Sequence, residues 1–268
     1  MSALTFTLRQ EPPQRLDLSP LLPHLLDRKS EKQIASLVIS TTKERLRVGD
    51  MFKIRLGDAD KIRFAHGSAR FDRIGCGMTS GTITVAGDVG LYAGRMMEGG
   101  TLTIEGNAGH WAASGLKAGR IAVHGNCGDF LGGPFPGEMA GMRGGIVHVA
   151  GSAGARAGDR MRRGIISVDG GAGDYAGSRM IAGTLIVSGR AARLPGYLMK
   201  RGTIVLGRGA DALSPTFVES GSGMPAILGL MARELARLDI SPAALRRRQF
   251  ARFGGDTAVL GKGELFSG

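Results

Sequence analysis

The sequence has few cysteines, few aromatic residues and no long apolar run. Two cysteines, Cys76 and Cys127, are too few for a disulfide framework or a cysteine quartet around zinc. One tryptophan and three tyrosines leave a nucleic acid without the aromatic side chains on which bases stack, which disfavours nucleic-acid binding. Since no run approaches roughly eighteen apolar residues and the first residues lack a signal-peptide pattern, we expect no membrane span and a soluble, cytoplasmic protein.

Acidic residues are also scarce relative to basic ones. The chain carries 35 Lys and Arg against 23 Asp and Glu, which gives a formal net charge of +12. Most of the basic residues are arginine. An excess of this size favours a basic face that meets an acidic partner, such as phosphate, a polycarboxylate or another subunit.

Glycine, in contrast, is abundant: the chain has 45 in 268 residues, whereas the usual share is about 7%. The glycines mark an internal repeat, because residues 145–163 (GIVHVAGSAGARAGDRMRR) and 164–182 (GIISVDGGAGDYAGSRMIA) are nearly the same unit. Units are nineteen residues long except one, which has about seven extra residues around 134–140, and a weaker unit occupies 61–80. The regular units begin at Gly81, Gly100, Gly119, Gly145, Gly164, Gly183 and Gly202.

Each place in the unit has a constant character. The third and fifth places are aliphatic, as in Ile83 and Val85, and the place between them is mostly polar or small, which is typical of a short half-buried strand. The ninth place is small or apolar, and the seventeenth is Met or Leu. Such a unit can bury these side chains only when stacked on its neighbours, at about 4.8 Å per rung. We therefore expect an all-β fold, a single-stranded parallel β-helix, right-handed by the usual crossover preference.

The glycines at the seventh, tenth and fourteenth places are expected at the corners of this solenoid, where the chain needs a positive φ or a close approach of two backbones. Residues 151–158 and 170–177 look like nucleotide-binding loops, yet each leads into another strand and not into a helix. His110 and Asp129 share a column and are interpreted as a stacked surface pair. Cys127 fills the small ninth place, which predicts a buried, unreactive thiol. The sequence indicates no catalytic, cofactor-binding or metal-ligating residues.

The extent of the repeat divides the chain into three regions: an N-terminal cap (1–59), the β-helix domain (60–212) and a C-terminal helical arm (213–268). A cap is needed because the open edge of the first rung would otherwise pair with another chain. Within the cap we expect strands at 4–8, 34–40 and 51–56 and a brief helix in 19–30.

In the C-terminal arm, apolar residues at helical spacing after Pro225 predict one amphipathic helix. Ser241 as N-cap and Pro242 at the first helical position predict a second helix, and its arginine run at 246–248 is interpreted as a solvated face. The last residues, from Gly254 on, are expected to form an arm that docks elsewhere.

The repeated units, of the form G-x-φ-x-V-x-G-x-x-G-x-x-x-G-x-x-M with φ aliphatic, resemble those of the family formed by the C subunits of formylmethanofuran dehydrogenases. They are also similar to the C-terminal domain of glutamate synthase large subunits. The resemblance covers roughly residues 60–212. The sequence LSPTFVES at 213–220, followed by an amphipathic pattern, favours the stand-alone subunit, and the units look most like the C subunit of the bacterial formyltransferase/hydrolase complex.

This resemblance implies a non-catalytic structural subunit of a one-carbon enzyme complex. Its sister subunits (formyltransferase, amidohydrolase-like and dehydrogenase-B-like) would move a formyl group between a tetrahydropterin, tetrahydromethanopterin, and a furan-type carrier, methanofuran or methylofuran, and release formate. The metal would belong to a sister subunit, and the carrier bears glutamate residues. The chain itself is expected to bind no cofactor.

The resemblance also suggests what the basic excess contacts: an acidic sister subunit or the polyanionic carrier. Three alternatives stay open: the C subunit of a redox formylmethanofuran dehydrogenase, a self-assembling β-solenoid scaffold, and an independent β-helix enzyme acting on a polyanionic polysaccharide. The candidate contact residues are Arg156, Arg160, Arg162, Arg163 and Arg179.

Overall fold

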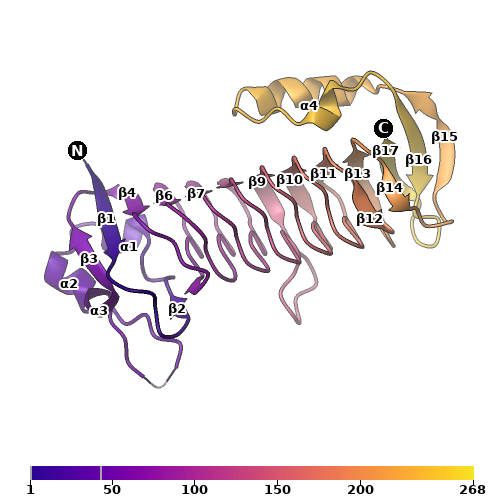
Figure 1. Cartoon of the computed structure of the whole chain (residues 1–268). Coiled ribbons are helices and arrows are strands. Elements are labelled where there is room, and N and C mark those ends of the chain that lie inside the picture. Colours follow the sequence, from indigo (N-terminus) through magenta and orange to yellow (C-terminus); the bar gives the residue numbers. More distant parts are fainter. Residues whose placement is uncertain (1, 43) are drawn as a thin grey trace.

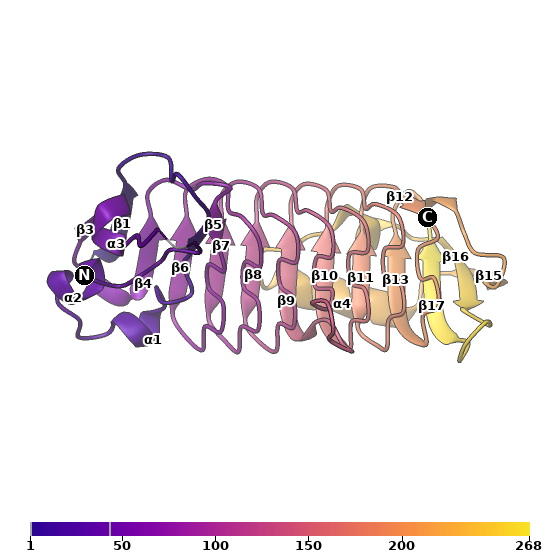
Figure 2. The ribbon, with the colours of Figure 1, turned by 90° about the horizontal axis from the view of Figure 1, so that it is seen from below.

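The computed structural model describes residues 2–42 and 44–268 and shows a column of stacked coils (Figure 1). Most strands belong to one thirteen-stranded sheet, in the order β15-β16-β17-β13-β11-β10-β9-β8-β7-β6-β4-β1-β3. Each rung contributes one strand to it, and the strands lie side by side along the column (Figure 2). The parallel strands of the column are β4 (Asp58–Phe64), β6 (Thr82–Val85), β7 (Thr101–Ile104), β8 (Arg120–Val123), β9 (Arg143–Val149), β10 (Arg163–Val168), β11 (Thr184–Val187) and β13 (Arg201–Leu206).

Strand register follows the repeat register. Ile83 of β6 lies opposite Leu102 of β7, and Leu102 lies opposite Ile121 of β8. The longer unit does not disturb this alignment, since Ile121 pairs with Val147 of β9 across the inserted residues. The expected all-β solenoid with a mostly parallel sheet is confirmed.

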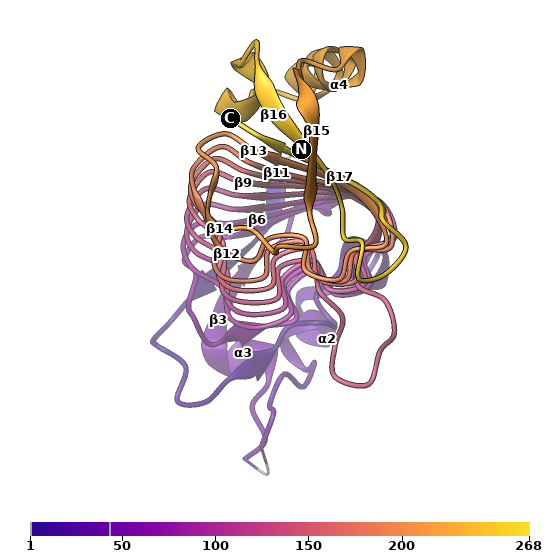
Figure 3. The ribbon, with the colours of Figure 1, turned by 90° about the vertical axis from the view of Figure 1, so that its right-hand side faces the viewer.

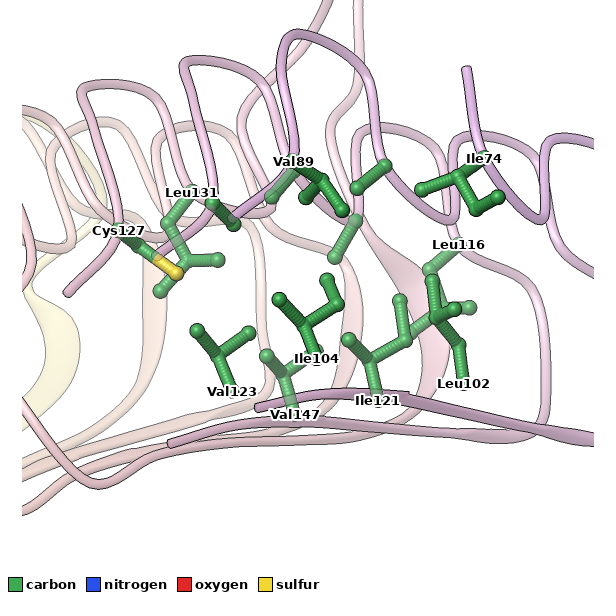
Figure 4. Packing of buried hydrophobic residues seen from close by; sticks show 14 of the residues in the cluster. Ile74, Val89, Leu102, Ile104, Leu116, Ile121, Val123, Cys127, Leu131 and Val147 are labelled. Carbon is green, nitrogen blue, oxygen red and sulfur yellow. The ribbon is translucent and has the colours of Figure 1, made fainter. Parts of the chain in front are cut away.

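The interior of the column is a continuous apolar core made by these aligned places (Figure 4). The third-, fifth- and seventeenth-place side chains are fully buried, as with Ile121, Val123 and Met161. A second ladder runs along the ninth place, where Cys127 bridges Ala108 on one side and Ala153 on the other. At its end β12 (Ala191–Arg193) pairs in parallel with β14 (Ala210–Ala212).

The corner glycines serve two different needs. At the first place of the unit the backbone is left-handed, as at Gly202 with φ +106°. At the seventh place the need is mostly space: a Cβ on Gly189 would lie 2.6 Å from the carbonyl carbon of Gly170 in the preceding rung. Only a residue without a side chain lets the two backbones approach this closely.

The N-terminal cap closes one end of the sheet. In it β1 (Ala3–Leu8) pairs in parallel with β4 and antiparallel with β3 (Phe52–Arg55), so the expected strands at 4–8 and 51–56 are present. The rings of Phe6, Phe52, Phe64 and Phe71 pack against each other beneath it, with the first and third stacked at 5.0 Å. The remaining elements are β2 (Leu16–Asp17), α1 (Pro23–Leu26), α2 (Glu31–Ala35), α3 (Val48–Met51) and β5 (Phe71–Asp72).

The strand expected at 34–40 is wrong. Its first residues belong to α2, because Ser30 and Gln33 form a reciprocal capping box that starts a helix there. Beyond the helix, Val38 and Ser40 form only isolated antiparallel bridges. The brief helix expected in 19–30 is α1.

The C-terminal region differs from the expected pair of helices. The first helix is present as α4 (Ala226–Ala236), but the second is wrong: only one 3₁₀ turn, η1 (Ala243–Arg246), forms. It is followed by β16 (Phe250–Gly255), which pairs antiparallel with β15 (Val218–Gly223) and with β17 (Lys262–Ser267). Buried Phe250 stacks edge-on against Phe266 across this pairing, and such burial outweighs the local helical signal.

The last strand extends the column, since β17 pairs in parallel with β13. Helix α4 packs on the outer face of the sheet, where Leu228 and Leu235 join a separate apolar cluster with Ile186 and Val205. Ser167 is fully buried on this same outward column, and its hydroxyl has no hydrogen-bond partner among the described residues. No helix in residues 2–42 and 44–268 is long and apolar enough to cross a membrane.

Candidate functional site: a basic edge beside an inserted loop

The extra residues of the long unit form a loop, here called the inserted loop (134–140), which projects from the column on the side away from α4 (Figures 1 and 3). It is held in place by neighbouring rungs. The Phe135 ring lies 5.5 Å from the Tyr92 ring, and the Arg95 guanidinium lies 4.8 Å from the centre of the Phe135 ring. Arg95 also donates to the Glu138 carboxylate at 2.6 Å. The loop is therefore anchored at both ends and presents Met139, whose side chain is 76% exposed.

The ion pair that holds the loop is only partly shielded from water. The hydrogen bond from Arg95 lowers the pKa of Glu138, and partial burial of this carboxyl acts in the opposite direction. The carboxylate therefore stays charged, and the loop stays anchored, over the neutral pH range.

Beside the loop lies an open groove of about 380 Å³ that combines cations with apolar side chains. We call it the basic groove. Its cations come from three successive rungs, so they follow the axis of the column. Its lining residues are Arg160, Arg162, Arg179 and Lys200, with Met139, Ile181, Leu198 and Val259.

One buried carboxylate fixes the position of an arginine that lines the groove. Asp159 is 1% exposed and accepts hydrogen bonds from Arg179 at 3.0 and 2.8 Å and from the Ser178 hydroxyl at 2.7 Å. Arg160 donates to the backbone carbonyl of Glu138 at 3.3 Å. Two of the groove's arginines are thus fixed by the chain itself, whereas Arg162 is exposed.

The groove belongs to a longer stripe of cations. Exposed lysines and arginines occupy one or both of the last two places in several units, although the unit 164–182 ends in Ile181 and Ala182. Strand pairing puts Arg163 opposite Arg143 and Arg201 opposite Lys262. None of these side chains forms an ion pair with another described residue, whereas Lys117 in the same column is neutralised by Glu98 at 2.6 Å. Like charges stacked at rung spacing repel one another and favour an external anion. We call the groove and these cations the basic edge: Arg143, Arg160, Arg162, Arg163, Arg179, Lys200, Arg201 and Lys262.

The structure brings together most of the arginines predicted from the sequence. Arg160, Arg162 and Arg179 line the groove, and Arg163 begins the adjacent strand β10. Arg156 lies apart, at a neighbouring corner, with its guanidinium 5.9 Å from the Phe130 ring and 5.1 Å from the Tyr175 ring.

Sequence reasoning missed several members of the basic edge. The signal was available, because the eighteenth place of the unit is basic at Arg143, Arg162 and Lys200, and identical places stack. Lys262 could not be found in this way, since it lies outside the repeat and joins the stripe only because β17 pairs with β13.

The other residues singled out from the sequence have structural roles, in hydrogen bonding between rungs or in core packing. His110 and Asp129 do stack on adjacent rungs: the His110 ring accepts a hydrogen bond from the Asp129 backbone N–H at 2.9 Å, and both side chains are about half exposed. Cys127 is buried, and its burial raises the pKa of the thiol to about 12. Within residues 2–42 and 44–268, no three His, Cys, Asp or Glu side chains group in a way that could hold a metal ion.

The fold and this site define a class: an all-β solenoid that presents a basic edge, most of whose cations form no ion pair with another described residue. No family model matches the sequence. A curated protein, the C subunit of the formyltransferase/hydrolase complex Fhc of Methylorubrum extorquens, is 43% identical over 86 residues, which is 32% of this chain and 32% of that protein. That match thus spans about a third of the relative's length.

A solved structure extends the likeness to nearly the whole chain. It is the X-ray crystal structure of the formyltransferase/hydrolase complex (FhcABCD) from Methylorubrum extorquens in complex with methylofuran. One chain of it is 42% identical, with a TM-score of 0.93 and with 98% of each chain covered. The chain belongs to the family of C subunits of the formyltransferase/hydrolase complex, and the resemblance seen in the repeat is confirmed.

Proposed function

We propose that this chain is a structural subunit of a formyltransferase/hydrolase complex and that the chemistry is performed by its sister subunits. The observation that carries the proposal is the 42% identity, over 98% of both chains, to a chain of a solved complex of this kind. By the family resemblance, the complex transfers a formyl group between a tetrahydropterin and a furan-type carrier and releases formate. The metal and the pterin would then belong to sister subunits. We also propose, as expected from the sequence, that the β-helix is right-handed and that the protein is located in the cytoplasm.

The use of polar side chains inside the repeat supports a structural role. At one corner Asp88 accepts from the backbone N–H of Asn107 at 2.7 Å, and Asn107 accepts from that of Asn126 at 2.8 Å. Asn126 accepts in turn from Ser152, and Ser152 from Gly171 at 3.0 Å. These side chains join one rung to the next, so their bonding capacity is used within the column.

The basic edge is proposed to contact an acidic surface of a sister subunit. All of its cations except Arg160 and Arg179 are exposed and form no ion pair with another described residue, so a partner that supplies carboxylates gains Coulomb energy there without breaking existing ion pairs. Arg160 and Arg179 are partly buried, and Arg179 is already paired with Asp159. A second candidate is the furan-type carrier with its glutamates, because cations repeated at rung spacing also suit a chain of carboxylates. The related complex was solved with methylofuran.

The test is assembly of the full chain with its sister subunits, co-expressed from the same organism. We expect Arg162→Glu/Arg163→Glu/Lys200→Glu to abolish co-purification, whereas reversal of the exposed arginines Arg246→Glu/Arg248→Glu, outside the basic edge, leaves it intact. If the triple variant assembles but the complex loses its carrier, the carrier is the partner of the edge. The proposal fails if the unmodified chain does not co-purify with the sister subunits, or if it catalyses formyl transfer or hydrolysis alone. Molybdenum or tungsten in the complex would instead indicate the redox relative.

A further inference from the structure

The few large aromatic residues of the repeat are gathered in one stripe. The Trp111 ring stacks on the Tyr92 ring at 5.7 Å and on the Phe130 ring at 5.2 Å, almost parallel to the latter at 7°. The Arg156 guanidinium continues the stack between Phe130 and Tyr175. Tyr175 in turn lies 5.7 Å from Tyr197. The stripe contains every tyrosine and the only tryptophan of the sequence, and we call Tyr92, Trp111, Phe130, Arg156, Tyr175 and Tyr197 the aromatic stripe.

The backbone beneath the stripe is unfavourable for such side chains. Five of its members occupy the twelfth place of successive units and have positive φ, between +57° and +64°. Bulky residues rarely adopt this left-handed conformation, whereas glycine or asparagine does so readily. The conformation continues at Leu194 in the next rung and so belongs to the corner itself, but large rings placed there in four rungs point to a use for the side chains beyond turning the corner.

The stripe also carries polar groups that the column does not use. No hydroxyl of Tyr92, Tyr175 or Tyr197 forms a hydrogen bond within the described residues, and neither does the indole N–H of Trp111. All four side chains are at least partly exposed, so these groups face outward. Tyrosine, tryptophan and arginine are the residue types that dominate binding energy at protein interfaces.

The rings restrict the kind of partner. Both faces of Trp111 are covered, by Tyr92 and Phe130, and Arg156 lies over the ring of Tyr175. A nucleobase or a sugar needs a free ring face to stack on, whereas ring edges, hydroxyls and guanidinium groups suit a protein surface that offers apolar side chains and oxygen acceptors.

We propose that the aromatic stripe is the centre of the surface by which this chain docks onto a sister subunit, with the basic groove as its charged rim. The inserted loop joins the two parts, because Phe135 packs on Tyr92 at one end and Met139 lines the groove at the other. The partner surface is a folded protein with apolar side chains at its centre and carboxylates beside them. The inference rests on the proposed function.

The experiment measures the affinity of the purified full-length chain for the complex that lacks it, by biolayer interferometry. Trp111→Asn and Tyr175→Asn remove a ring but keep a residue that accepts the left-handed backbone. We expect each to weaken binding by at least about 30-fold, as loss of an interface hot spot does. Tyr175→Phe, which removes only the hydroxyl, should have a smaller effect.

Two control variants separate docking from folding. Leu194 occupies the twelfth place of the unit that follows Tyr175, and its φ is +56°. The thermal midpoint of Leu194→Asn therefore reports what an asparagine at this place does to the stability of the fold. Ile227→Asn replaces a 56% exposed side chain on α4, on the opposite side of the column, and should bind like the unmodified chain.

If Trp111→Asn and Tyr175→Asn bind with the affinity of the unmodified chain, the inference is wrong. The proposed function would still stand in that case if charge reversal of the basic edge prevents assembly. Capture of an oligosaccharide or RNA by the stripe, or self-association that depends on Trp111, would overturn the inference as well. If the unmodified chain does not bind the remaining subunits at all, the proposed function itself fails.

Discussion

The close approach of backbones at the seventh-place corner makes a quantitative prediction for Gly189→Ala. The new Cβ would lie 2.6 Å from both the carbonyl carbon and the oxygen of Gly170 and 2.8 Å from the nitrogen of Gly171. All three atoms belong to backbone, so no side chain can rotate away. Because φ at this position lies outside the left-handed region, the effect isolates the loss of space from any backbone strain.

The magnitude follows from what must move. Relief of the contacts requires the two rungs to separate locally, which lengthens the hydrogen bond from Gly189 N–H to the Gly170 carbonyl, now 2.9 Å, and disturbs the one from Arg208 N–H to the Gly189 carbonyl, at 3.2 Å. Overpacking of this kind costs about 1–3 kcal/mol. With about 2–4 °C per kcal/mol for a chain of this size, the midpoint should fall by about 2–12 °C.

The assay is thermal unfolding of the full chain followed by circular dichroism. Gly254→Ala is the matched control, since a Cβ there meets nothing within 4 Å and φ is not positive; its midpoint should stay within about 1 °C of the original. An unchanged midpoint for Gly189→Ala would show that the corner has room for a side chain, and the explanation of the seventh-place glycines would be wrong.

Three further predictions concern single groups. Ser167→Ala removes a buried hydroxyl that has no partner among the described residues, so the midpoint should rise by about 2–4 °C; a fall would indicate a hydrogen bond that the structure does not contain. Iodoacetamide at pH 8 should leave buried Cys127, with its pKa near 12, unlabelled until the chain unfolds, and rapid native labelling of Cys127 would contradict its burial; Cys76 is only partly buried, and because burial raises its pKa it should react slowly in the native chain. Because the hydrogen bond from Arg95 lowers the pKa of Glu138, its contribution is complete above the ordinary pKa of 4.5 and is lost as pH falls through the lowered value; the protection of the inserted-loop amides, that is, their exchange rate relative to the intrinsic rate at the same pH, should stay constant at pH 5–7 and fall once the pH drops through the lowered pKa, whereas Arg95→Gln should reduce it throughout.

The repeat explains why the centre of the fold could be predicted from one sequence. Each place is sampled in seven units, so an aliphatic third place such as Ile83 or Leu102 is recognised as a column and not as a chance residue. Stacking then converts the column into a buried ladder without any knowledge of long-range contacts.

The ends are single-copy, and there local signals compete with tertiary ones. The apolar residues at 34–40 read as a strand, but the capping box at Ser30 makes their first part a helix. Ser241 and Pro242 are good helix-starting residues, yet the chain makes one turn and then uses Phe250 in a strand against Phe266. A local cap therefore determined the structure at 34–40, whereas strand pairing determined the structure after Pro242.

The candidate site shows the same division. The arginine-rich unit pointed to Arg160, Arg162 and Arg179, which do lie together. The aromatic stripe escaped notice because its place in the unit changes chemistry from Tyr to Trp, Phe and Arg, and a count of aromatic residues does not reveal that they are stacked.

Both ends of the column are closed by antiparallel pairing, β1 with β3 at one end and β15 with β16 at the other. Its length is therefore set by the number of units between them, and each unit adds one step of about 4.8 Å. Removal of a complete unit, such as residues 164–182, would draw the two ends together by one such step and keep every remaining ladder continuous. Two partners that bind at different rungs are therefore held at a fixed separation, and evolution can change that separation only in whole steps of one rung.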